Sequence, residues 1–120
     1  MLTVGESAHL VRSYSQDDLH AFAALSSASV KAVPEPLIAA LFSQLLGMEL
    51  PGFGTNYLKQ ELRFKTPAPL NTPLEARVEI IRLRPEKHLV DLCATCRTID
   101  GRLICEGRSL VKAKDVPNAF

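Results

Sequence analysis

The sequence lacks four features that mark specialised classes of protein. It has no apolar run of the roughly 18 residues that a membrane-spanning helix needs, and its start, MLTVGESAHLVRS, lacks the basic leader and apolar core of a secretion signal. Its formal net charge is only +1, without the basic excess of a nucleic-acid binder. Its three cysteines lack a disulfide-framework spacing, which fits a reducing compartment. We therefore expect a cytoplasmic protein with neither a membrane nor a nucleic-acid partner.

One stretch of the sequence is almost wholly apolar. Residues 36–48, PLIAALFSQLLGM, carry no charge, and their polar members are Ser43 and Gln44. A helix that is apolar all round is enclosed by protein, and a helix of about 20 Å is too short to cross a bilayer. Pro36 suits a first helical turn, where its missing N–H costs nothing, and we expect Gly47 to mark the C-cap. The sequence thus predicts a long buried helix.

Strand patterns flank this helix on both sides. Before it we expect a strand at residues 8–14 and a helix of about ten residues, capped by Ser15 and Asp18. After it we expect four antiparallel strands, at residues 56–65, 74–83, 88–98 and 102–112. The whole chain, residues 1–120, is then a single domain of α+β class, in which an antiparallel sheet wraps a long buried helix. This is the hot-dog fold, and its open sheet edge predicts pairing into a homodimer.

Two local signals fix details of these strands. In residues 56–65, Leu58 and Leu62 alternate with Tyr57 and the charged residues, so we expect the leucines on the covered face and Tyr57 on the wet face. The dipeptide Asp100-Gly101 favours the positive-φ turn of a hairpin. It predicts that the last two strands pair directly.

Three short patterns follow one another within residues 41–67. They are S-x-L-L-G from Ser43, L-P-G-x-G from Leu50 and Y-L-x-Q-x-L-x-F-x-x-P from Tyr57. With DDLHAFAALS upstream, at residues 17–26, they resemble the (R)-specific enoyl-CoA hydratases, also called MaoC-like dehydratases. The resemblance covers almost the whole chain. It implies a hot-dog fold and an acyl-CoA or acyl-carrier-protein thioester as ligand, and we expect no cofactor and no metal.

The part of the family pattern that carries the chemistry is missing. In the family a loop of the form G-D-x-N-P-x-H-x-D follows the first helix, and its Asp and His hold the water that adds across the enoyl double bond. Here Ser26 is separated from Val33 by a short stretch, and residues 21–55 contain no Asp, Asn or His. The sequence therefore lacks the catalytic dyad.

The start of the buried helix also departs from the family. Where the family has His-Gly, whose glycine N–H polarises the thioester carbonyl, this chain has Pro34-Glu35-Pro36. Two prolines remove two N–H donors, which predicts a poor oxyanion site. Glu35 has two interpretations. It is favoured by the helix dipole wherever a helix starts, or it acts as base or nucleophile with a pKa raised by burial, as the acidic residue of hot-dog thioesterases does.

The remaining candidates have simpler explanations. Ser43 matches a helix serine near the family's active site, but a buried serine on a helix also bonds back to the carbonyl one turn earlier. We take Glu35, Leu37 and Ser43 as the candidate substrate-binding residues.

Cys93 and Cys96 lie three apart on a strand and so point to opposite faces, which argues against a zinc site.

Two functions remain open. The first is a hydratase-like protein that binds acyl thioesters without the family's standard hydratase activity, alone or in support of a complete subunit. The second is an active acyl-CoA enzyme. It is either an enoyl-CoA hydratase or dehydratase with replacement groups, such as His20, or a thioesterase that uses Glu35. The missing dyad favours the first.

Overall fold

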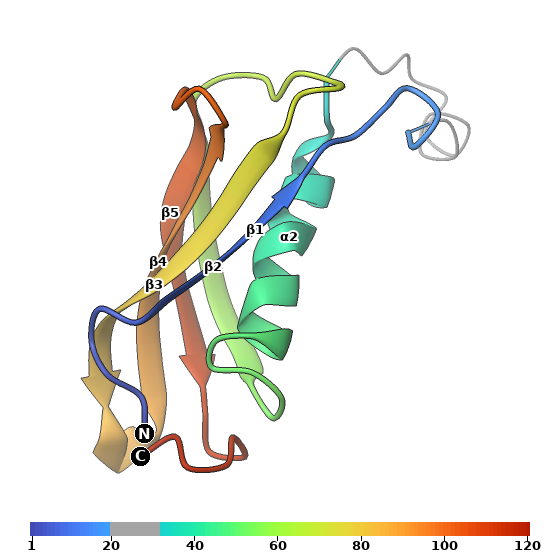
Figure 1. The fold of residues 1–120 in the computed structure, drawn as a ribbon. Coiled ribbons are helices and arrows are strands. Elements are labelled where there is room, and N and C mark those ends of the chain that lie inside the picture. The colour runs from blue at the N-terminus through green and yellow to red at the C-terminus, as the bar shows by residue number, and fades with distance from the viewer. Residues whose placement is uncertain (20–31) are drawn as a thin grey trace.

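The structure is a computed structural model that describes residues 1–19 and 32–120. In this part of the chain one α-helix, α2 (Glu35–Met48), lies along the inside of a five-stranded antiparallel sheet with strand order β1-β3-β4-β5-β2 (Figure 1). The short helix expected after Ser15 falls largely outside the described residues. The α+β hot-dog class is confirmed. The strands are β1 (Ser7–Arg12), β2 (Asn56–Phe64), β3 (Leu74–Arg84), β4 (Leu89–Thr98) and β5 (Leu103–Lys112), and a 3-10 turn, Pro85–Lys87, joins β3 to β4.

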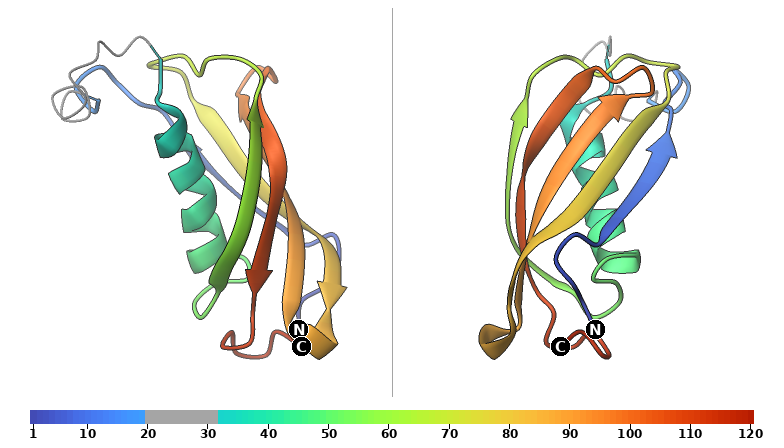
Figure 2. Two further views of the ribbon diagram at one scale, coloured as in Figure 1. Left: turned by 180° about the vertical axis from the view of Figure 1, so that it is seen from behind. Right: turned by 60° about the vertical axis from the view of Figure 1, so that its left-hand side comes forward.

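Helix α2 packs one face against the sheet. Figure 2 shows the curved sheet passing along one side of the helix, with β2 at one edge and β1 at the other. The side chains that enter the core recur at helical spacing, which is how a helix presents a single stripe. They are Ile38, Leu41, Phe42, Leu45 and Leu46.

The opposite face of α2 is open in the single chain. Ala40, Ser43, Gln44 and Met48 are exposed, and Met48 keeps 55% of its surface accessible. The prediction of a helix enclosed on all sides is therefore wrong for one copy, because one sheet covers one side of a helix. The face left open carries no charge among these four residues and combines apolar Ala40 and Met48 with polar Ser43 and Gln44.

The helix ends at Met48, as its apolar stretch predicts, but Gly47 does not cap it. Gly47 lies within the last turn, and Glu49 is the C-cap in a right-handed conformation. The final carbonyls are closed by chain that follows, since Leu50 donates its N–H to the Leu45 carbonyl oxygen at 2.9 Å. The positive φ expected of a C-cap glycine occurs later, at Gly52. The prediction for Gly47 was thus wrong.

Strand β2 departs from simple alternation. Tyr57 and Lys59 pair with consecutive residues of β5, so Leu58 is the extra residue of a β-bulge. The bulge turns Tyr57 towards the covered side, where its hydroxyl lies 3.4 Å from the Ser109 hydroxyl, and leaves Leu58 51% exposed. The predicted assignment of these two side chains is therefore reversed, because one inserted residue exchanges the two faces.

Two other local predictions are confirmed. Gly101 has φ +98° in the turn that joins β4 to β5, and Thr98 donates its N–H to the Arg102 carbonyl oxygen at 2.9 Å to close the hairpin. At the start of the chain the expected reciprocal cap is present. The Ser15 N–H donates to Asp18 Oδ2 at 2.8 Å, and the Asp18 N–H donates to Ser15 Oγ at 3.1 Å; these bonds lower the pKa of the Asp18 carboxyl.

Candidate functional site

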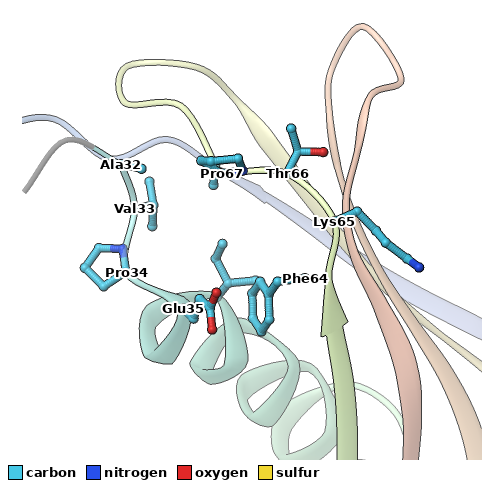
Figure 3. A pocket seen from close by; sticks show the side chains of 10 residues that line it. Ala32, Val33, Pro34, Glu35, Phe64, Lys65, Thr66 and Pro67 are labelled. Carbon is cyan, nitrogen blue, oxygen red and sulfur yellow. The ribbon is translucent and has the colours of Figure 1, made fainter.

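A cavity of about 350 Å³ opens at the N-terminal end of α2. One wall is the chain that leads into the helix, and the other is the end of β2 and the segment after it (Figure 3). This volume is within the range of small-molecule sites, roughly 300–1,000 Å³. The lining is mostly apolar and consists of Ala32, Val33, Pro34, Glu35, Ile38, Phe64, Lys65, Thr66, Pro67 and Ala68.

Backbone hydrogen bonds hold the two walls in place. Val33 donates its N–H to the Ala68 carbonyl oxygen at 2.9 Å, and the two residues form an antiparallel bridge. Beyond the end of β2, Lys65 donates its N–H to the Ile104 carbonyl oxygen at 2.8 Å. The Thr66 hydroxyl donates to the Leu103 carbonyl oxygen at 2.9 Å. The entrance of α2 is thus tied to the segment after β2, and that segment is tied to β5.

Glu35 is the one carboxylate among the lining residues. It is the first residue of α2, follows an N-cap proline that makes no side-chain cap, and is exposed to solvent. Its carboxylate extends into the mouth of the cavity near Phe64 (Figure 3). Within the described residues no hydrogen bond or ion pair holds the carboxylate. A catalytic glutamate would be expected to be buried beside another polar group. In the single chain, Glu35 is exposed and has no such neighbour among the described residues.

Donors that could polarise a carbonyl are scarce at this helix entrance. Pro34 and Pro36 carry no N–H, and the Leu37 N–H donates to the Pro34 carbonyl oxygen at 3.0 Å. That leaves the Glu35 N–H, next to its own negative charge. An oxyanion site works by donors already aimed at developing charge, and this arrangement supplies few.

Lys65 brings a positive charge to the wall but not to the cavity interior. Its ammonium group points away from the cavity (Figure 3) and lies 3.8 Å from a Glu106 carboxylate oxygen. The same oxygen lies 3.9 Å from the guanidinium of Arg63. Two cations therefore share one carboxylate on the outer face of the sheet, and neither is paired with Glu35.

The other two candidate residues lie away from this cavity. Leu37 is half-buried and packs against the core. Ser43 lies two turns along α2 on the open face, and its hydroxyl donates to the Ala39 carbonyl oxygen at 3.5 Å, the geometry expected of a serine on a helix. Of the three candidates, Glu35 alone lines the cavity.

The second wall of the cavity was missed at the level of sequence. Phe64 and Pro67 belong to the Y-L-x-Q-x-L-x-F-x-x-P pattern, and Ala68 follows it directly. The signal was the proline-punctuated connection after a strand, which must pass the end of the helix in a sheet that wraps it. What the sequence does not reveal is the bridge between Val33 and Ala68, since it joins residues far apart in the chain.

The cysteines occupy the positions that strand alternation predicts. Cys93 is half-exposed, whereas Cys96 and its cross-strand partner Cys105 are buried. Burial raises the pKa of the Cys96 thiol to about 11 and that of Cys105 to about 12. No group of three metal-ligating side chains is found among residues 1–19 and 32–120, nor does any helix there have the length and hydrophobicity to span a membrane.

Comparison with known proteins identifies the family. No family model matches the chain. An (R)-specific enoyl-CoA hydratase of Aeromonas caviae is 36% identical over 127 residues, covering 92% of this chain and 95% of the relative. One from Rhodospirillum rubrum is 34% identical over 123 residues, covering 89% and 85%. Part of a 3-hydroxybutyryl-CoA dehydratase from Methylorubrum extorquens is 36% identical over 74 residues, covering 62% of this chain and 46% of the dehydratase.

Solved structures agree with these relatives. An (R)-hydratase from A. caviae superposes with a TM-score of 0.85 at 35% identity, covering 92% of this chain and 96% of that one. The R-hydratase PhaJ1 from Pseudomonas aeruginosa gives a TM-score of 0.81 at 28% identity, covering 95% and 83%. The alignment with the A. caviae relative runs over 127 positions but takes in 92% of these 120 residues, so the relative has residues inside the aligned region without a counterpart here. The chain belongs to the (R)-specific enoyl-CoA hydratase family of hot-dog proteins.

Proposed function

We propose that this protein binds acyl thioesters, carried by CoA or acyl-carrier protein, in the cavity at the start of α2, and that it does not hydrate them by the family's standard mechanism. The family membership and the mostly apolar cavity support the binding. The absence of hydration by the standard mechanism is inferred from one observation, that residues 21–55 contain no Asp, Asn or His.

Hydration of an enoyl thioester adds a water oxygen to one carbon and a proton to its neighbour. The site must therefore hold a group that removes a proton from water and a group that delivers one. Among the described lining residues Glu35 offers a carboxylate. The Thr66 hydroxyl is already donated to the Leu103 carbonyl oxygen, and the Lys65 ammonium lies near Glu106. A single unpaired carboxylate supports binding better than water addition.

A second candidate function rests on Glu35. Because its carboxylate reaches the cavity mouth, a thioester carbonyl bound there would lie near a base or nucleophile, and hydrolysis to acid and thiol would follow. Such a thioesterase also needs N–H donors that stabilise the oxyanion. Pro34 and Pro36 at the helix entrance have no N–H to donate, which makes this function less favourable. We rank this alternative, and a hydratase with replacement groups, below the binding function.

We place this binding protein in the cytoplasm and take its working form to be a homodimer. The free thiols support a reducing compartment. The open face of α2 and the edge of β2 with which no described strand pairs support a second copy, because a long exposed sheet edge favours pairing with another strand.

The test uses the purified protein with crotonyl-CoA and a panel of saturated acyl-CoAs. Calorimetry measures binding, loss of the conjugated enoyl absorbance measures hydration, and thiol release measures hydrolysis. We expect binding without hydration or hydrolysis above the buffer blank, and the same result for Glu35→Gln and for the matched control Glu49→Gln at the other end of α2. Turnover that Glu35→Gln abolishes and Glu49→Gln retains contradicts the proposal.

A further inference from the structure

Two adjoining hollows lie on the outer face of the sheet, where β2 runs beside β5. The smaller, of about 180 Å³, is lined by Glu61, Arg63, Gly107 and Arg108. The larger, of about 200 Å³, shares Glu61 and Arg108 with it and extends along β5 to Leu110. Neither contains a residue that lines the cavity at the start of α2. The outer face thus has a polar concave surface of its own.

The register of the two strands brings these side chains to one face. Glu61 and Arg63 stand two apart on β2, and Arg108 is paired directly with Glu61. Side chains two apart on a strand, and those directly opposite each other on neighbouring strands, point to the same side of a sheet. Leu62, between Glu61 and Arg63, packs against the core instead. The sequence therefore concentrates charge on the outer side of β2 and β5.

Gly107 contributes only backbone to the smaller hollow. It is paired with Leu62 of β2, and the two strands lie so close together there that a Cβ on Gly107 would overlap the backbone carbonyl of Glu61. A glycine inside a strand often marks such a close approach. The side chains that line the smaller hollow are therefore those of Glu61, Arg63 and Arg108.

Positive charge around the smaller hollow is incompletely neutralised. The ammonium of Lys65 and the guanidinium of Arg63 lie 3.8 and 3.9 Å from the same carboxylate oxygen of Glu106. Arg108 is exposed and makes no ion pair among residues 1–19 and 32–120. These three cations therefore have one carboxylate between them, in a chain whose formal net charge is only +1.

The two other carboxylates of these hollows have cations of their own. Glu61 lies 3.0 Å from the ammonium of Lys59, which, together with two neighbouring guanidinium groups, lowers the pKa of the Glu61 carboxyl. Asp91 accepts a hydrogen bond from the Arg84 guanidinium at 2.9 Å. Because both carboxylates are already paired, the excess of positive charge remains with the three cations around the smaller hollow.

We propose that the smaller hollow binds a phosphate group between Arg63 and Arg108. Guanidinium groups hold phosphate oxygens by paired, charge-assisted hydrogen bonds. Exposed ion pairs contribute little to stability, so Arg63 can exchange its distant Glu106 partner for a phosphate oxygen. Arg108 has no ion pair to break in the described part of the chain.

Two kinds of ligand carry such a group to this face. A free phosphate compound, such as a nucleotide, reaches the hollow from solvent. An acyl thioester of CoA or acyl-carrier protein has a phosphate at the far end of its pantetheine arm. When the acyl chain lies in the cavity, that arm passes Lys65, which lines the cavity wall and directs its ammonium away from it (Figure 3). Only this second source rests on the proposed function.

A phosphate titration followed through the backbone amides by NMR locates the site. Inorganic phosphate is added at constant ionic strength, because salt screens exposed charges. We expect saturable shifts at Gly107 and Arg108, and none at Val33 and Ala68 in the walls of the cavity. Shifts that do not saturate, or that centre on Val33 and Ala68, overturn the proposal.

Charge variants should change the phosphate affinity in opposite directions. Arg108→Gln removes a donor and should weaken binding about tenfold, whereas Glu61→Gln removes negative charge from the hollow and should strengthen it. Arg77→Gln is the matched control, since Arg77 lies on the same face of the sheet in β3, 2.8 Å from Glu79; the affinity should not change. Equal effects of Arg108→Gln and Arg77→Gln contradict a phosphate site at the hollow.

Crotonyl-CoA and crotonyl-pantetheine, which has no phosphate, identify the source. If Arg63→Gln and Arg108→Gln weaken binding of crotonyl-CoA but not of crotonyl-pantetheine, the arm of the thioester occupies the hollow. If they weaken binding of inorganic phosphate alone, the ligand is a free phosphate compound. A wild-type protein that binds phosphate but neither thioester refutes the proposed function and keeps the phosphate site.

Discussion

The Val33 N–H donates to the Ala68 carbonyl oxygen at 2.9 Å, and this bond joins the entrance of α2 to the segment after β2. Both residues are buried, Val33 at 4% and Ala68 at 2% exposure. A buried backbone bond of this kind is costly to leave unmade. It therefore fixes the two walls of the cavity relative to each other, and the position of Glu35 follows from it.

The charge at each end of α2 should affect stability with opposite sign. Glu35 lies in the first turn and Glu49 caps the last, so the helix dipole stabilises the former and opposes the latter. We expect Glu35→Gln to lower the free energy of unfolding by about 0.3–1 kcal/mol and Glu49→Gln to raise it by about as much. Urea denaturation at low and high salt measures both. If both variants changed the free energy of unfolding in the same direction, or if salt did not reduce the changes, the helix dipole would not be their cause.

Gly54 should resist substitution more than Gly5. Both have a left-handed φ, +98° for Gly54 and +97° for Gly5. A Cβ on Gly54 would overlap the backbone carbonyl of Asp115, whereas a Cβ on Gly5 would meet nothing within 4 Å. We expect Gly54→Ala to cost about 2–5 kcal/mol and Gly5→Ala about 1 kcal/mol, because overlap adds to backbone strain. Similar losses in thermal or urea unfolding would show that the close approach to Asp115 is wrong.

Neighbouring residues of α2 should differ sharply in their effect on stability. Leu45 is completely buried against the sheet, and Gln44 is exposed on the open face. Removing the Leu45 side chain should cost about 2–5 kcal/mol through lost burial and a new cavity. Gln44→Ala should stay within about 0.5 kcal/mol of the native protein. Denaturant melts of the two variants test which face of the helix is packed.

The three thiols should react very differently in the folded protein. The pKa of Cys96 is raised to about 11 and that of Cys105 to about 12 by burial. At pH 8 a thiol of pKa 11 is ionised to about one part in a thousand, and both are also shielded from reagent. We expect iodoacetamide to label Cys93 alone until the protein unfolds, as read by mass spectrometry of the intact chain. Rapid labelling of Cys105 in native protein would contradict its placement in the core.

The sequence was sufficient to predict where the helix and the strands lie. It was not sufficient to predict the bulge in β2 or the open face of α2. The buried helix and the strands follow from local periodicity, and the hairpin at Gly101 follows from turn chemistry. The bulge at Leu58 was not foreseen, because bulges are defined by the partner strand rather than by the strand itself. The open face of α2 was missed for a related reason. A helix that is apolar all round shows that it is covered, but not whether its own chain or another copy covers it.

The residues of the candidate site also differ in whether the sequence alone could predict them. Glu35 was found from sequence because it stands where the family pattern changes. Phe64, Thr66 and Ala68 were not, because they reach the helix entrance through the wrapping of the sheet and the bridge to Val33. Contacts of this kind have large sequence separation, and no local pattern encodes them.

Binding of an acyl thioester and its hydration can be measured separately in a single titration. Crotonyl-CoA is added to the purified wild-type protein, with heat recorded for binding and the enoyl absorbance followed in the same samples. We expect saturable heat and an absorbance that decays no faster than in buffer. Saturable heat with protein-dependent loss of the enoyl absorbance would contradict this expectation, as would the absence of any binding.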